Sequence, residues 1–133
     1  MKQRVRADVL AVIALGGMIG ATARYGLAQA LPTAPGTFPW ATFWTNVSGS
    51  LVLGFLLVLL LDRARTHRLL RPFLATGILG AYTTMSTYLV ETAVLIKDSH
   101  AGVGITYALS SLVVGLLLAY AGMVGARRLT PRR

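Results

Sequence analysis

Residues 83–88 read TTMSTY, so that four of the six side chains are threonine or serine hydroxyls. A hydroxyl donates a hydrogen bond without carrying a charge near neutral pH. No charged residue lies between Pro72 and Glu91, on either side of this run. Donors without a fixed charge suit a small anion, so the run predicts an anion path that includes Thr84 and Ser86.

Gly77 and Gly80 come just before the hydroxyl run. Threonine side chains compete for backbone carbonyls, and glycine adopts conformations that other residues avoid, so a helix is predicted to break near residues 80–84. Irregular backbone at membrane depth is tolerated only where protein buries it or where it lines a cavity. The carbonyl oxygens that a break exposes can hold a hard cation such as Na⁺.

Glu91 is an acidic residue inside an apolar stretch, one helical turn after Tyr88. An intramembrane carboxylate is functional by default, as a proton or cation site or as an acceptor for hydroxyls. The alternative is that Glu91 reaches interfacial water, because Lys97 follows soon after it. A hydroxyl face further along the chain could meet it: Tyr107, Ser110 and Ser111.

Two more polar side chains stand inside apolar stretches. Asn46 shares a helical face with Gly49 and Ser50, and it either lines a path or bonds a neighbouring helix. Three roles are open for Arg24, near the end of the first apolar stretch. It reaches the interface, ties down a loop, or attracts anions into a vestibule.

The elements that position these residues are predicted to be membrane helices. Hydrophobic residues make up 55% of the 133 residues, and charged residues only 13%. A spanning helix needs about 20 apolar residues, so four fit, at about 8–31, 41–61, 73–96 and 102–125. Prolines and glycine punctuate the chain between the first and second helices. The predicted fold class is an all-α membrane protein, with a single four-helix domain over 1–133 and a third helix broken near its middle.

The basic residues gather at helix ends. Of the 13 lysines and arginines, all but Arg24 and Lys97 precede the first helix, lie between the second and third, or follow the fourth. These segments share one side of a four-helix protein, so the positive-inside rule predicts a multi-pass protein of the cell's inner (plasma) membrane with both termini cytoplasmic. In so apolar a chain, the net charge of +9 indicates this topology rather than a nucleic-acid partner.

Several function classes are disfavoured. The absence of cysteine excludes disulfides and thiolate sites. His67 and His100 flank helices without matching ligands or nucleophiles, so no enzyme is expected. Closely spaced small residues predict a compact bundle, and so short a chain is expected to associate with itself or a partner to enclose a pathway. These small residues are Gly16 and Gly20, Gly17 and Ala21, Ser50 and Gly54, and Ser111, Gly115 and Ala119.

Three motifs, in order along the helices, resemble the CrcB/Fluc family of fluoride channels. They read GGMIGATARY at 16–25, TNVSGS at 45–50 followed by Gly54, and GAYTTMSTY at 80–88. The resemblance extends over nearly the whole chain. It implies an antiparallel dimer of four-helix subunits in the lipid bilayer, with two narrow pores, passive export of fluoride ion that lowers cytoplasmic fluoride, and a structural Na⁺ at the dimer centre.

Position by position, the resemblance implies roles for the residues above. The backbone carbonyls of Gly80 and Thr83 would hold the Na⁺. Asn46 would be the polar group of the pore, and Arg24 would lie in the vestibule. Three further residues would match the polar track along each pore: Glu91, Tyr107 and Ser111.

The chain departs from the family at the two aromatic positions of the third motif, where Met85 and Tyr88 replace phenylalanine. The edge of a phenylalanine ring is electropositive and can face an anion. Tyrosine keeps this edge and adds a donor, whereas methionine has no such edge. Met85 and Tyr88 remain in the predicted pore path. The alternatives are a non-conducting subunit, or one that conducts only as a heterodimer with a partner that retains phenylalanine.

The charge distribution bears on the same choice. An antiparallel homodimer needs one sequence to insert in both orientations, which requires a weak basic bias, and the bias here is strong. We therefore hypothesise the termini-inside half of a heterodimer; a homodimer stays open, because late insertion can override the bias. A small-multidrug-type, proton-coupled transporter is the competing class. It requires a membrane-embedded carboxylate, usually in the first helix, and Glu91 is the candidate here.

Overall fold

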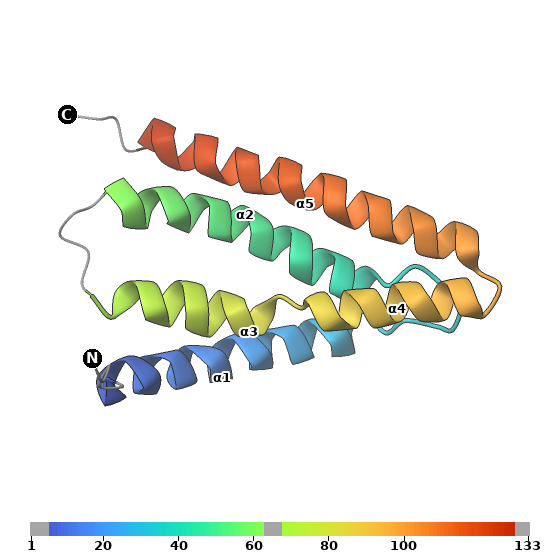
Figure 1. The fold of residues 1–133 in the computed structure, drawn as a ribbon, viewed down its shortest axis with the longest axis horizontal. Coiled ribbons are helices and arrows are strands. Elements are labelled where there is room, and N and C mark those ends of the chain that lie inside the picture. Colours follow the sequence, from blue (N-terminus) through green and yellow to red (C-terminus); the bar gives the residue numbers. More distant parts are fainter. Residues whose placement is uncertain (1–5, 63–67, 130–133) are drawn as a thin grey trace, which may run out of the picture.

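The computed structural model describes residues 6–62 and 68–129, and the regular structure of these residues is helical (Figure 1). Three helices are long: α1 (Ala7–Ala30), α2 (Trp40–Asp62) and α5 (Ala101–Leu129). The remaining stretch is divided into a π-helical segment η1 (Pro72–Leu79), a single turn α3 (Gly80–Tyr82) and α4 (Met85–Lys97). Four helices, one of them interrupted, therefore fit the chain.

The bundle has the dimensions and composition of a multi-pass membrane protein. The helices α1, α2 and α5 are each long and apolar enough to cross a membrane. The segments η1, α3 and α4 follow one another along the length of the bundle, and α1 begins at the same end at which α5 finishes (Figure 1). Helix α5 continues to Leu129, beyond the predicted end at 125.

The third helix is interrupted at Thr83 and Thr84, within the predicted interval of 80–84. Both residues have extended backbone, with φ and ψ of −76° and 156° at Thr83 and −147° and 121° at Thr84. Gly80 stays helical (φ −63°, ψ −31°), so glycine is not the residue that leaves the helix. Thr84 instead starts α4, because its Oγ1 accepts a hydrogen bond from Thr87 N at 3.2 Å.

Glycines bring two pairs of helices into backbone contact; of the glycines in these contacts, Gly16 belongs to the predicted small-residue spacing, whereas Gly77 and Gly122 do not. A Cβ added at Gly122 of α5 would lie 2.9 Å from Phe55 N of α2 and closer still to Leu51 O. A Cβ at Gly16 of α1 would lie 3.0 Å from the Cα of Gly77 in η1. Side chains at these positions are excluded by backbone, which cannot move aside without shifting a helix.

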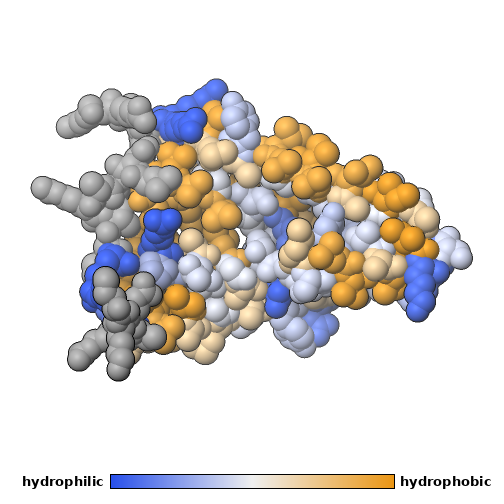
Figure 2. Space-filling model, in the orientation of Figure 1, coloured by the Kyte–Doolittle hydropathy of each residue, from blue (hydrophilic) through white to orange (hydrophobic). Residues whose placement is uncertain are grey.

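The interior of the described bundle is small. Large apolar side chains lie on its outside, for example Leu116 at 64% exposed and Leu117 at 61% on α5. Figure 2 shows hydrophobic residues over much of the sides of the bundle, and hydrophilic residues at its two ends and in a smaller group near its middle. A surface of this kind suits lipid or another subunit rather than water. The buried apolar cluster consists of Phe43, Val47, Leu95 and Tyr107.

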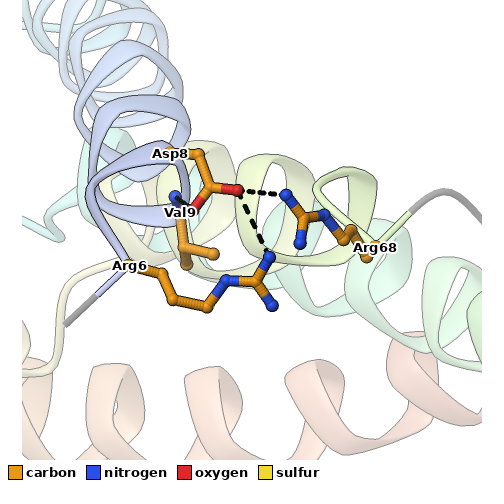
Figure 3. Close-up of polar contacts among 4 residues, drawn as sticks. All are labelled: Arg6, Asp8, Val9 and Arg68. Carbon is orange, nitrogen blue, oxygen red and sulfur yellow. Dashed lines mark hydrogen bonds and ion pairs between the residues drawn. The ribbon is translucent and has the colours of Figure 1, made fainter. Parts of the chain in front are cut away.

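An ion-pair cluster links the start of α1 to the residues before η1 (Figure 3). Asp8 Oδ2 pairs with Arg6, at 3.4 Å, and with Arg68. Asp8 Oδ1 accepts a hydrogen bond from Val9 N at 3.0 Å, where a carboxylate suits the positive end of the helix dipole. Both arginine side chains are more than half exposed, so the cluster adds little stability.

This end of the bundle carries those basic residues of the positive-inside argument that the structure describes. Arg6 and Arg68 lie beside Asp8, Arg71 precedes η1, and Arg127 and Arg128 lie in the last turn of α5. The other basic residues of that argument lie outside the described residues: Lys2, Arg4, Arg63, Arg65, Arg132 and Arg133. His67 lies outside them as well.

Candidate functional site

The break in the third helix is held by Asn46 of α2. Its Nδ2 donates to the Thr84 carbonyl and its Oδ1 accepts from the Thr84 N–H, each at 2.9 Å. One carboxamide thus satisfies two backbone groups that the interruption removes from the helical ladder. Of the two roles open for Asn46, the structure shows the contact with a neighbouring helix. A carboxamide has two donor hydrogens, so the second one remains for another acceptor.

The hydroxyls around the break are largely used within the chain. Thr83 Oγ1 donates to Leu79 O, and Thr84 Oγ1 donates to Thr87 Oγ1, each at 2.9 Å. The Ser86 hydroxyl lies 3.4 Å from that of Thr84. Because a hydroxyl has a single proton, Thr83 and Thr84 have none left for an anion. Thr87 accepts from Thr84 and keeps its own proton, which makes it a donor that the sequence prediction had not singled out.

The predicted cation ligands lie at the same break. Helix α3 ends at Tyr82, and the Thr84 N–H, which would bond Gly80 in a continuous helix, goes to Asn46 instead. Within 6–62 and 68–129, the structure shows no donor to the carbonyl oxygen of Gly80 or of Thr83. Free backbone carbonyls of an unwound helix suit a hard cation such as Na⁺. Two carbonyls supply only part of a coordination shell.

The carboxylate of Glu91 joins three helices. Thr42 of α2 donates to its Oε1 at 2.9 Å, and Tyr107 of α5 donates to its Oε2 at 2.8 Å. The side chain of Tyr107 is fully buried and that of Thr42 nearly so. Both carboxylate oxygens therefore act as acceptors, which fits an ionised group stabilised by neutral donors. This is the hydroxyl network that had been one of the alternatives for Glu91.

The two positions that depart from the resembling family point in different directions. Met85 is 69% exposed on the outside of the bundle. Tyr88 faces inward: its hydroxyl donates to Ala108 O of α5 at 3.0 Å, and its ring centroid lies 5.4 Å from that of Tyr107. The Tyr88 proton is thus committed to a backbone carbonyl, so that the ring edge, rather than the hydroxyl, is what this side chain can offer a ligand.

Ser111 has a different status from the other serines. It is 8% exposed, and its Oγ has no hydrogen-bond partner among the described residues. The neighbouring Ser110 bonds the Tyr107 carbonyl at 3.2 Å. A buried hydroxyl without a partner costs free energy, and such a group in a native structure commonly marks the place of a ligand or water.

Arg24 lines a cavity of about 460 Å³ between α1, α2 and α4. Glu91 and hydroxyl-bearing residues line it too, yet no hydrogen bond or ion pair of Arg24 is found in the described part of the chain. The guanidinium therefore does not tie down a loop through such a bond here. The threonines that line the cavity are Thr33, Thr42, Thr45, Thr84 and Thr87.

Besides Thr87, sequence reasoning missed two further members of this site. Thr42 lies four residues before Asn46 on the same helical face, and extending the Asn46–Gly49 pattern by one turn would have found it. Ser48, whose Oγ lies 3.0 Å from the Tyr82 hydroxyl, carried no such signal, because the contact depends on the length of the tyrosine side chain.

Comparison with known proteins gives consistent matches. Residues 11–123 match the family described as CrcB-like protein, Camphor Resistance (CrcB). A Streptomyces avermitilis protein named fluoride-specific ion channel FluC 2 is 44% identical over 96% of this chain and 81% of its own length. FluC 3 of the same organism is 42% identical over 99% of this chain and 65% of its own length. The Thermus thermophilus fluoride-specific ion channel FluC is 41% identical over 84% of this chain and 87% of its own length. The chain therefore belongs to the CrcB-like family.

Proposed function

We propose that this chain is a subunit of a fluoride-selective ion channel that exports fluoride passively and thereby lowers cytoplasmic fluoride. The observation that carries the proposal is the break at Thr83 and Thr84, held by the single amide of Asn46. Irregular backbone of this kind within a membrane needs protein or a polar cavity around it. The relatives named fluoride-specific ion channels supply the identity of the ion.

Passive export needs no coupled reaction. HF is a weak, neutral acid that crosses the bilayer and ionises inside the cell, where the fluoride anion is trapped. The negative membrane potential drives an anion outward with about 2.3 kcal/mol per 100 mV, so a selective path suffices. Passive export therefore requires hydrogen-bond donors along the path, and it requires no site for ATP or for a second transported ion.

Selectivity for fluoride over chloride follows from narrowness and from donors that replace a tightly held hydration shell. Ser111 offers a buried hydroxyl without a partner, Thr87 keeps its proton, and Tyr88 offers a ring edge. We place Asn46, Glu91 and Tyr107 along the same path, with Met85, Thr84 and Ser86 beside it, and Arg24 at a vestibule. In this arrangement Arg24 attracts anions into the cavity, and Glu91 orients the donors around it.

The channel is proposed to be an antiparallel dimer with two pores. The large exposed apolar surface of the single chain supports association with lipid and a second subunit. A heterodimer with a related subunit is favoured over a homodimer by the strong basic bias and by exposed Met85, which a partner's phenylalanine would complement. Streptomyces avermitilis has relatives named FluC 2 and FluC 3, so related subunits occur within one organism. We also propose that the chain spans the plasma membrane with both termini on the cytoplasmic side.

A structural Na⁺ is proposed at the dimer centre. The donor chemistry fits, because the carbonyl oxygens of Gly80 and Thr83 receive no hydrogen bond among the described residues. A second subunit would complete the shell with its own pair of carbonyls. The ion would lock the two breaks together and take no part in moving fluoride.

The proposal is tested with purified chain in liposomes loaded with fluoride, using an ion-selective electrode to record efflux after the addition of a potassium ionophore. Rapid efflux from the chain alone supports a self-sufficient homodimer. Efflux that requires co-expression with a related subunit supports the heterodimer. Silence in both preparations, from protein shown to be folded and dimeric, contradicts a conducting role and favours the non-conducting alternative.

A further inference from the structure

Three successive residues at the break each contact α2. Thr84 is bonded on both backbone groups by Asn46. A Cβ added to Gly49 would overlap the Thr83 methyl group, so these two residues lie in direct contact. Tyr82, the last residue of α3, has its hydroxyl 3.0 Å from Ser48 Oγ. The proposed function uses the contact of Asn46 with Thr84 and leaves that of Ser48 with Tyr82 without a role.

The direction of the Ser48–Tyr82 hydrogen bond follows from counting protons. Ser48 Oγ also lies 2.5 Å from the Trp44 carbonyl of its own helix, and a carbonyl can only accept. The single proton of Ser48 therefore goes to Trp44, and the Tyr82 hydroxyl must be the donor to Ser48. The result is a directed chain from Tyr82 through Ser48 to the backbone of α2.

Tyr82 is also confined by packing. A Cβ built on Gly49 of α2 would lie 3.4 Å from its ring atom Cδ1, and a Cβ built on Gly20 of α1 would lie 3.0 Å from its backbone nitrogen. The backbone of α3 thus fits closely against one helix and the ring against another. Because the ring cannot move freely, the hydroxyl bond fixes the rotation of α3 about its axis, and with it the peptide planes that follow.

We propose that the Tyr82 hydroxyl and Ser48 form a positioning pair, which fixes the helix break at Thr83 and Thr84 relative to α2 in addition to the Asn46 clamp. The effect of this pair on transport rests on the proposed function. Its effect on the break itself is independent of that function. Tyr82 does not contact the transported ion in this account; it sets the position of the groups that do.

The test is a cycle of Tyr82→Phe, Ser48→Ala and the double variant, in full-length protein in lipid nanodiscs. Hydrogen exchange is read by mass spectrometry on peptides that contain Thr83 and Thr84. Loss of one net hydrogen bond of ordinary strength predicts about fivefold faster exchange at the break for each single variant. The double variant should be no faster than the faster single variant, because both remove the same bond.

Two controls separate the positioning role from general damage. Tyr120→Phe makes the same chemical change at a tyrosine that is 62% exposed, and it should leave exchange at the break unchanged. Ser48→Thr keeps the hydroxyl, so exchange at the break should stay as slow as in wild-type protein, in contrast to Ser48→Ala. Unchanged exchange in Tyr82→Phe, or effects that add in the double variant, overturns the proposal.

Fluoride efflux provides the second readout and keeps the two proposals apart. If wild-type protein conducts, Tyr82→Phe should lower the ratio of fluoride to chloride efflux severalfold, whereas a merely stabilising contact would leave that ratio unchanged. An unchanged ratio in a conducting Tyr82→Phe channel contradicts the positioning role in transport. If wild-type protein does not conduct, the proposed function fails, and hydrogen exchange still decides whether the pair positions the break.

Discussion

The two halves of the bundle are held together by different interactions. In the half that carries the chain ends, helices touch backbone to backbone at glycines, as Gly122 does against Leu51 and Gly16 against Gly77. In the half beyond the break, polar side chains connect the helices, and Glu91 is bonded by both Thr42 and Tyr107. The break at Thr83 and Thr84 lies between the part held by backbone contacts at glycines and the part held by polar side chains.

The difference indicates which half supports the structure and which half can bind an ion. Backbone contacts at glycine tolerate no insertion, so the half with the chain ends is a rigid support. Hydrogen bonds between hydroxyls, carboxylate and amide can be exchanged for bonds to water or an anion at modest cost, because each is worth about 1 kcal/mol net, or up to about 3 where a charged group takes part. The polar half is therefore the part of the molecule that can serve an ion, and the following variants test that division.

The largest effect is expected from Gly122→Val. The added Cβ would meet the Leu51 carbonyl and Phe55 N, which are backbone atoms of α2, so overpacking should cost more than about 4 kcal/mol and prevent folding. Yield of monodisperse protein on size-exclusion chromatography measures this. The matched control is Gly125→Val, where an added Cβ meets nothing within 4 Å. Equal yields from the two variants would contradict the rigid-support interpretation.

Asn46→Ala should have the next largest effect. It leaves the N–H and C=O of Thr84 without their partner, at a cost of about 3 kcal/mol for two unpaired groups. The measurement is the thermal unfolding midpoint in detergent, with Gln29→Ala as the control, because Gln29 is an exposed amide whose Nε2 donates to the Tyr25 hydroxyl on its own helix. A midpoint for Asn46→Ala that matches the control would show that the amide does not hold the break.

Tyr107→Phe and Thr42→Val each remove one neutral donor from Glu91. Hydrogen bonds to a charged group are worth about 1.5–3 kcal/mol, so each variant should lose about 2 kcal/mol of unfolding free energy. Combining them should cost more than the sum, because the carboxylate then has no donor from either helix. Denaturant unfolding of the single and double variants measures this coupling. Strict additivity would mean that the two donors act independently of each other and are not coupled through Glu91.

Ser111→Ala should have the smallest effect on stability and a clear effect on transport. Since the hydroxyl has no partner among the described residues, its removal breaks no hydrogen bond within the chain and should not lower the unfolding free energy. Fluoride efflux should nevertheless fall at least about fivefold, the loss of one hydrogen bond to the ion. Ser110→Ala removes a hydroxyl that bonds backbone and serves as the control. Equal efflux from the two variants would remove Ser111 from the ion path.

The sequence predicted the architecture well because apolar length and proline positions determine it. The break was located within 80–84 from threonine and glycine, but the residue that leaves the helix is Thr83 and not Gly80. Local conformational preference cannot separate these positions. The outcome depends on Asn46, 38 residues before Thr84, which bonds that backbone.

The candidate site was predicted in part. Glu91 and Tyr107 were expected to meet from their shared polarity, and the structure brings them together. The number of free donors was overestimated, because a sequence does not show which hydroxyl protons go to the chain itself, as those of Thr83 and Tyr88 do. Thr42 was missed because the polar face of Asn46 and Gly49 was not followed one turn toward the start of the helix, although the sequence places Thr42 on that face.

The most direct test of the central claim is the simultaneous efflux of fluoride and chloride from liposomes loaded with both anions, using this chain alone and with a co-expressed related subunit. A fluoride-selective channel subunit should give fast fluoride efflux with chloride retained in at least one of the two preparations. Equal release of both anions, or retention of both by folded protein in each preparation, would contradict a fluoride-selective channel subunit.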